Sequence, residues 1–216
     1  MDLMKKGAGN VIELINYTPD PENTVATAAK CCYSSADLAE LRKGIEEKSQ
    51  TVFIKRLIKT GHHSPIEHAC FTFAVEGVSR SLLAQITRHR LASFSVKSQR
   101  YVSEYGMNFN YIVPETIEKA PKEFKYIDKD AYQIYEEFML IVLATYEKLI
   151  DLGIPKEDAR YILPNATETK FVFTMNAREL RHFFNLRCCG KAQWEIRELA
   201  WETYRQVYEV APALFE

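Results

Sequence analysis

The stretch between Glu76 and Glu104 contains no acidic residue, although six basic side chains fall within it: Arg80, Arg88, His89, Arg90, Lys97 and Arg100. Guanidinium groups bind phosphate oxygens in bidentate fashion, and hydroxyl groups can occupy the acceptor positions that remain. The cations alternate with apolar residues and three interleaved serines, a pattern typical of a folded pocket rather than an exposed basic tail. The segment therefore predicts an anion site, with phosphate as the obvious ligand.

Hydrophobic periodicity predicts a helix over residues 79–88, in which Leu82, Leu83 and Ile86 form the apolar face. Continuing the same helix would carry His89 and Arg90 to its buried side. An isolated buried charge is costly. Either the helix ends near residue 88, or an anion neutralises these side chains inside the protein.

Several motifs in this order resemble those of the flavin-dependent thymidylate synthases. An Arg-His-Arg triplet at residues 88–90 is followed, after seven residues, by Ser98, as in that family's signature. Gln85 precedes the triplet and Arg100-Tyr101 follows the serine, again as in the family. Further similar blocks are found at residues 61–68 (GHHSPIEH), 176–180 (NAREL), 186–187 (LR) and 192–196 (AQWEI). The resemblance covers roughly residues 10 to 210.

The expected fold is α+β, with a twisted, mostly antiparallel sheet flanked by helices. At 216 residues and 47% hydrophobic content, the chain can bury one core, so we expect a single domain over residues 1–216. Strands are expected at 11–17, 70–78 and 166–175, and helix-like segments at 21–32, 37–59, 79–88, 129–152, 177–188 and 192–210. Residues 93–113 read as irregular or strand-like, at the edge of the sheet. The resemblance implies assembly as a homotetramer with sites shared between subunits.

The charge and hydropathy of the chain exclude several classes of protein. The formal net charge of -1 does not favour long-range attraction to nucleic acid. No apolar run approaches the roughly 20 residues of a membrane span, and the N-terminus lacks the apolar core of an export signal. We therefore expect a cytoplasmic protein with no nucleic-acid or membrane partner.

The five cysteines form two adjacent pairs, Cys31-Cys32 and Cys188-Cys189, with Cys70 alone. This spacing suggests neither a disulfide framework nor a metal site. One alternative remains open, because Cys188 or Cys189 lies beside Arg187 and a cysteine-dependent methylase would need such a nucleophile.

Arg187 occupies an apolar face of the helix expected at 177–188, after Leu180, Phe183 and Phe184 in the i, i+3, i+4, i+7 pattern. We therefore expect it to face inward. A structural ion pair, for example with Glu195, would explain this position without any function. The resemblance implies instead that Arg187 contacts a uracil base and promotes its ionisation at N3.

The resemblance implies roles for other residues as well. The catalytic residues would be Arg187 and Ser98. The residues that hold deoxyuridine monophosphate (dUMP) would be Gln85, Arg88, Ser98, Gln99, Arg100, Arg160 and Arg187. Those that hold FAD would be His68, Cys70, Arg88, His89, Arg90, Asn176, Arg178 and His182. Where some family members have an asparagine and an acidic residue in the signature loop, this chain has Ser95 and Val96, and His182 and Lys191 also depart from some relatives.

The implied reaction is a reductive methylation of dUMP to dTMP. Methylenetetrahydrofolate would supply the carbon and NADPH would reduce bound FAD, so no enzyme cysteine would act as nucleophile. No Gly-x-Gly-x-x-Gly fingerprint is present, which excludes a Rossmann turn as the flavin site. Two other hypotheses stay open: the cysteine-dependent methylase, and an RNA-binding module that uses the arginine-rich loop and tyrosines.

Overall fold

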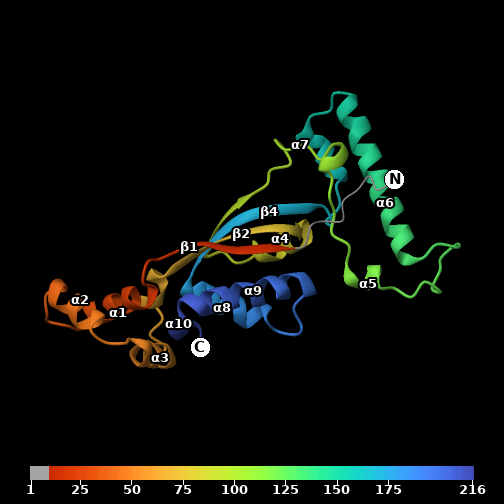
Figure 1. Ribbon diagram of the computed structural model, residues 1–216. Coiled ribbons are helices and arrows are strands. Elements are labelled where there is room, and N and C mark those ends of the chain that lie inside the picture. Colours follow the sequence, from red (N-terminus) through yellow and green to blue (C-terminus); the bar gives the residue numbers. More distant parts are fainter. Residues whose placement is uncertain (1–9) are drawn as a thin grey trace. The chain divides into compact units, whose positions relative to one another are not determined.

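The computed structural model describes residues 10–216 and shows an α+β fold with a four-stranded antiparallel sheet (Figure 1). The strand order is β1-β2-β4-β3, with bounds Val11–Tyr17 for β1, Cys70–Ser79 for β2, Glu168–Asn176 for β4 and Ala92–Val96 for β3. The three predicted strands are confirmed. The signature segment forms β3, which confirms its expected place at a sheet edge.

The chain divides into two compact units. The α6 unit comprises Glu76–Ala84 and Val96–Lys170, and is named after its longest helix, α6 (Ala131–Asp151). The α8 unit comprises Val11–Val75, Gln85–Ser95 and Phe171–Glu216, and contains helix α8 (Ala177–Arg187). Each unit carries part of the residue set that the sequence singles out.

The two central strands, β2 and β4, bury alternate side chains, as strands with one covered face do. In the α8 unit, Phe71 and Phe73 of β2 are fully buried, as is Phe173 of β4. The rings of Phe73 and Phe173 stack with centroids 5.1 Å apart. Aromatic pairs of this kind stabilise a sheet beyond the area that they bury.

The helix-like segment 37–59 is two helices, α2 (Leu38–Glu46) and α3 (Thr51–Lys59), rather than one. The buried Gln50 lies at the break. Its Nε2 donates to the carbonyl of Ile45 at 2.9 Å and to that of Lys48 at 2.6 Å, and its Oε1 accepts from Lys30. These bonds satisfy carbonyl groups at the end of α2, so the chain can turn before α3 begins.

The helix of the signature segment, α4, runs from Arg80 to Ile86 and so ends before Arg88. The expectation that the helix ends near residue 88 is therefore confirmed. Ile86 is fully buried, whereas Arg88 and Arg90 are exposed. Only His89 of the triplet is buried, at 4% exposure.

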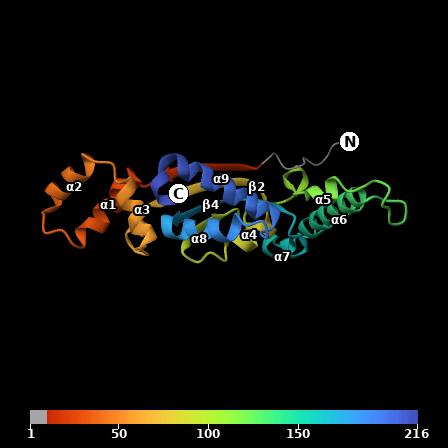
Figure 2. The same cartoon turned by 90° about the horizontal axis from the view of Figure 1, so that it is seen from below.

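Two further helices follow α8 in the chain: α9 (Trp194–Val210) and the short α10 (Pro212–Phe215). Helix α8 packs against α9, and α9 packs against β1, which Figure 2 shows from below. At the other end of the α8 unit, α1 (Pro21–Cys31) contacts α2, α3 and the 3₁₀ helix η1 (Pro65–His68).

The α6 unit begins its long helix with a capping box, in which Asp130 and Gln133 satisfy each other's backbone N–H groups. The helix ends before Gly153, whose φ of 83° suits glycine. Its remaining elements are η2 (Gly106–Asn108), α5 (Glu115–Glu118), α7 (Lys156–Ala159) and η3 (Arg160–Ile162). Among the described residues, no helix is long and apolar enough to cross a membrane.

Candidate active site

A buried histidine and glutamate from distant parts of the chain meet in the α8 unit. His89 follows α4, and Glu179 lies in the first turn of α8. The His89 Nδ1 atom is 2.9 Å from Glu179 Oε1, and both side chains are almost fully buried. Burial lowers the pKa of His89, since loss of hydration outweighs the opposing effect of the Glu179 carboxylate.

Arg187, at the end of α8, contacts the other side of the same imidazole. Its Nε donates to His89 Nε2 at 3.3 Å, and its Nη2 lies 3.4 Å from the carbonyl oxygen of Gln85. Burial lowers the pKa of Arg187, and the nearby charge of Arg88 adds to this effect. The expectation that Arg187 faces inward is therefore confirmed.

These residues line a cavity of about 480 Å³ in the α8 unit. Its walls are Arg88, His89, Arg90, Leu91, Glu179, His182, Leu186 and Arg187. Three guanidinium groups and two imidazoles thus surround one cavity that also contains a single carboxylate. A site with this composition suits an anionic ligand such as a phosphate ester.

The imidazoles and carboxylate of the cavity could in principle bind a metal ion. Ligating atoms of His89, Glu179 and His182 all lie within 4.8 Å of one another. The arginines of the same cavity, however, repel a cation at short range. Arg187 also occupies the His89 nitrogen that a metal would need. The arrangement favours an anion over a metal ion.

The first turn of α8 also contains Asn176 and Arg178. Asn176 is the N-cap, and its Oδ1 accepts from the backbone N–H of Glu179 at 2.9 Å. Arg178 is exposed and pairs with Glu67, with Nη1 and Oε1 2.5 Å apart. Neither lines the His89 cavity, so the structure brings together only some of the residues expected to hold FAD.

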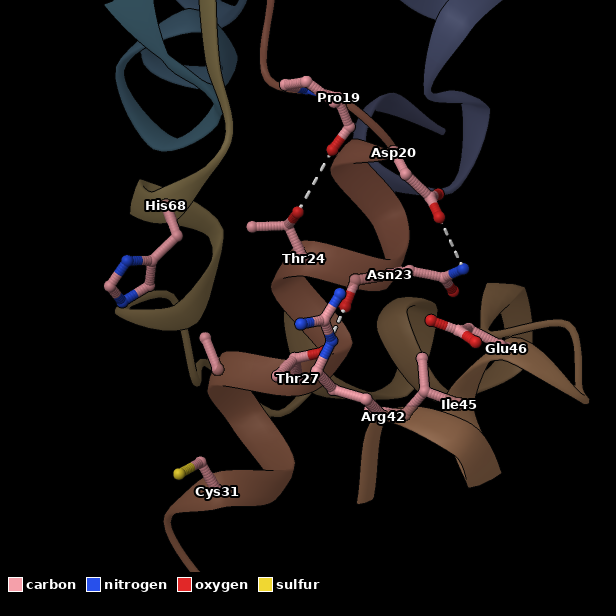
Figure 3. A pocket seen from close by; sticks show the side chains of 11 residues that line it. Pro19, Asp20, Asn23, Thr24, Thr27, Cys31, Arg42, Ile45, Glu46 and His68 are labelled. Carbon is pink, nitrogen blue, oxygen red and sulfur yellow. Dashed lines mark hydrogen bonds between the residues drawn. The ribbon is translucent and has the colours of Figure 1, made fainter. Parts of the chain in front are cut away.

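His68 lines a second pocket of about 540 Å³, shown in Figure 3. The other walls of this pocket come from α1, from α2 and from the turn before α1, where Asp20 accepts a 2.7 Å hydrogen bond from Asn23. The two pockets share no lining residue. Cys70 is exposed, and its backbone N–H donates to Thr18 at 2.9 Å.

The signature loop continues into the α6 unit, which carries Ser98, Gln99, Arg100 and Arg160. Ser98 Oγ accepts from the backbone N–H of Arg100 at 3.3 Å. Arg100 is exposed and its Nε lies 3.0 Å from a carboxylate oxygen of Glu157. Arg160 Nε donates to the carbonyl of the same glutamate at 3.0 Å. Glu157 therefore holds both arginines.

Two functional candidates escape analysis of the sequence alone. Glu179 is one, and Glu104, whose buried carboxylate pairs with the half-buried Lys97, is the other. The Lys97 ammonium lies 2.8 and 3.0 Å from the two carboxylate oxygens of Glu104, and this pair anchors the chain on both sides of Ser98 and Arg100. Burial raises the pKa of Glu104 although Lys97 opposes the change. In the sequence, Glu179 stands out only as part of the similar block at residues 176–180, and no local pattern there indicates that it is buried against His89.

Comparison with known proteins identifies a family that spans nearly the whole chain. The family model described as "Thymidylate synthase complementing protein" matches residues 13–213. A flavin-dependent thymidylate synthase of Geobacter sulfurreducens is 48% identical over 204 residues, which is 94% of this chain and 84% of the relative. The flavin-dependent thymidylate synthase of Clostridium tetani is 45% identical, over 98% of this chain and 87% of the relative. The flavin-dependent thymidylate synthase of Pyrococcus furiosus is 39% identical, over 91% of this chain and 78% of the relative.

Proposed function

This chain belongs to the thymidylate synthase complementing protein family, and we propose that it is an enzyme of thymidylate biosynthesis that methylates dUMP to dTMP. The proposed carbon donor is methylenetetrahydrofolate, the cofactor is FAD and the reductant is NADPH. One observation carries the proposal. Five residues singled out from separate sequence blocks, Arg88, His89, Arg90, His182 and Arg187, line one cavity.

The FAD assignment rests on the donors that the cavity offers. A dinucleotide carries two phosphates, and the guanidinium groups of Arg88 and Arg90 can bind such oxygens, with His89 and His182 beside them in the same cavity. Asn176 and Arg178 at the start of α8 would extend this set, as would His68 and Cys70. When bound, the flavin would supply the electrons that complete the methyl group.

Arg187 is the proposed catalytic contact to the uracil base. A fixed cation stabilises a pyrimidine that becomes anionic, and it does so most strongly where water is excluded. Gln85 and Arg88 would complete the nucleotide contacts of the α8 unit. The α6 unit would contribute Ser98, as the hydroxyl near the reacting ring, together with Gln99, Arg100 and Arg160.

The proposed reaction needs no cysteine nucleophile. Burial raises the pKa of the Cys188 thiol to about 11. At neutral pH its thiolate fraction is then on the order of 1 in 10⁴, whereas the thiolate is the reactive form. Cys189 is exposed, and neither thiol lines the cavity that contains His89. Methylation without cysteine therefore agrees best with the local chemistry.

The whole chain is proposed to act as one functional domain within a homotetramer. Helix α6 exposes Ile134, Phe138, Leu140 and Ile141, an apolar surface that suits a contact between subunits. The proposed location is the cytoplasm, where the five cysteines, all free thiols, would stay reduced.

The absorption spectrum of the protein tests this function. Purified protein is loaded with FAD, desalted and mixed anaerobically with NADPH, with and without dUMP. A retained flavin band that bleaches at a rate responsive to dUMP, followed by dTMP formation when methylenetetrahydrofolate is added, is the expected result. A protein that retains no flavin and forms no dTMP would contradict it. Binding of RNA that weakens steeply with salt would then favour the RNA-binding hypothesis.

A further inference from the structure

We propose that Glu179 is a positioning residue for Arg187 and acts through the imidazole of His89. The three side chains form a chain of contacts, in which Glu179 fixes the ring and the ring fixes the guanidinium group. This inference rests on the proposed function, because Arg187 is the group proposed to contact the nucleotide base.

The chemistry of the two outer groups determines where the histidine proton lies. An ionised carboxylate only accepts hydrogen bonds, so the 2.9 Å contact with Glu179 requires a proton on His89 Nδ1. A guanidinium group only donates, so the 3.3 Å contact with Arg187 requires a lone pair on His89 Nε2. The ring is therefore neutral, with its proton on Nδ1. A proton on Nε2 would place two donors against each other.

Apart from Glu179, every charged or titratable group of the cavity agrees with a neutral ring. Arg187 and His182 both disfavour a positive charge on His89, as burial does, and only Glu179 favours it. Arg88 and Arg90 add two further cations to the same cavity. Glu179 therefore selects the tautomer of His89 without giving the ring a full charge.

The backbone of α8 holds Glu179 in place for this role. Its N–H is bonded to the N-cap Asn176, so the first turn of the helix is fixed. In a capping box, a glutamate at this third position would bond back to the N-cap backbone. Here its carboxylate reaches instead to His89, 90 positions away in the sequence.

The consequence for Arg187 follows from the shape of its side chain. A guanidinium group carries five N–H donors in one rigid plane. The imidazole fixes the direction of Nε, and the carbonyl of Gln85 lies near Nη2. Because the group is planar, these two contacts also fix the direction of its remaining donors. A ligand in the cavity would thus meet an arginine that is already oriented.

Two substitutions of Glu179 separate positioning from charge. Glu179→Leu removes the acceptor, whereas Glu179→Gln keeps an oxygen that accepts from Nδ1 but carries no charge. Glu198→Leu, at an exposed position on α9, is the matched control. Binding of dUMP is measured by calorimetry and turnover by dTMP formation. The ¹⁵N spectrum of histidine-labelled protein reports the tautomer, and His89→Gln identifies its signal among the five histidines.

We expect Glu179→Leu to weaken dUMP binding or turnover on the order of 10- to 100-fold, as misorientation of a binding group does. Glu179→Gln should stay within about threefold of the unsubstituted protein, because a neutral amide oxygen replaces the acceptor. The His89 signal should show the Nδ1–H form in the unsubstituted protein and in Glu179→Gln, and lose it in Glu179→Leu. Glu198→Leu should change none of these quantities.

Equal loss in the leucine and glutamine variants would overturn the inference, since charge rather than geometry would then matter. A His89 signal that is unaffected by Glu179→Leu would also overturn it. Thermal unfolding and flavin retention identify a variant that fails to fold. If Glu179→Leu does not fold, the glutamine variant and the ¹⁵N spectrum of the unsubstituted protein still test whether Glu179 fixes the tautomer of His89. Failure of the proposed function would look different: the unsubstituted protein would form no dTMP, while the tautomer of His89 would remain as stated.

Discussion

The two units hold their candidate binding arginines in different ways. In the α8 unit, Arg187 contacts a buried histidine that is itself fixed by a buried carboxylate. In the α6 unit, Arg100 is exposed and its partner, Glu157, is exposed as well. An exposed ion pair contributes little and exchanges readily with solvent, whereas a buried network keeps one geometry. We infer that Arg187 is oriented before a ligand binds, whereas Arg100 can exchange its partner for a ligand.

The largest expected effect comes from removing the preorganised arginine. Arg187→Ala should lower turnover by about 10²- to 10³-fold, the loss typical of a missing electrostatic contact to a developing anion. Bound flavin should remain, because Arg88 and Arg90 still line the cavity. The measurement is steady-state dTMP formation together with the flavin absorbance of the desalted protein. Arg197→Ala, on α9, is the control, and a full rate in Arg187→Ala would remove this residue from the active site.

A smaller loss is expected from the removal of a single hydroxyl in the signature loop of the α6 unit. Ser98→Ala removes the 3.3 Å hydrogen bond from the Arg100 backbone N–H. It also removes the hydroxyl proposed to lie near the reacting ring. Turnover should fall about three- to tenfold, in line with the net worth of one hydrogen bond. Since Ser98 is not part of the core, the unfolding temperature should stay unchanged. Unchanged kinetics would show that Ser98 only shapes the loop.

A substitution in the exposed pair of Arg100 and Glu157 should strengthen ligand binding rather than weaken it. Glu157→Gln removes the charge that competes with a phosphate for Arg100. The affinity for dUMP should rise about two- to fivefold, the range that a surface ion pair of roughly 0.5–1 kcal/mol allows. Titration calorimetry at two salt concentrations measures the change. Weaker binding would mean that Glu157 orients Arg100 for the ligand, and the contrast between the two units would then fail.

The sequence predicted those parts of the structure that depend on local patterns. The strands, the position of β3 at the sheet edge and the inward direction of Arg187 follow from alternation and helical periodicity. The contact between Glu179 and His89 joins residues 90 positions apart, and no local pattern encodes such a pairing. The break between α2 and α3 depends in the same way on the side chain of Gln50, whose partners become visible only in the folded chain.

The smallest expected effect concerns the thiols beside Arg187, and it distinguishes two chemistries. Cys188→Ser combined with Cys189→Ser should leave turnover within about twofold, because burial raises the pKa of the Cys188 thiol to about 11 and neither thiol lines the cavity that contains His89. The measurements are dTMP formation by the double variant and the flavin absorbance that it retains after desalting. Loss of all turnover with flavin still bound would favour the cysteine-dependent mechanism. In that case Arg187 would serve to activate a neighbouring thiol, rather than to stabilise charge on the base.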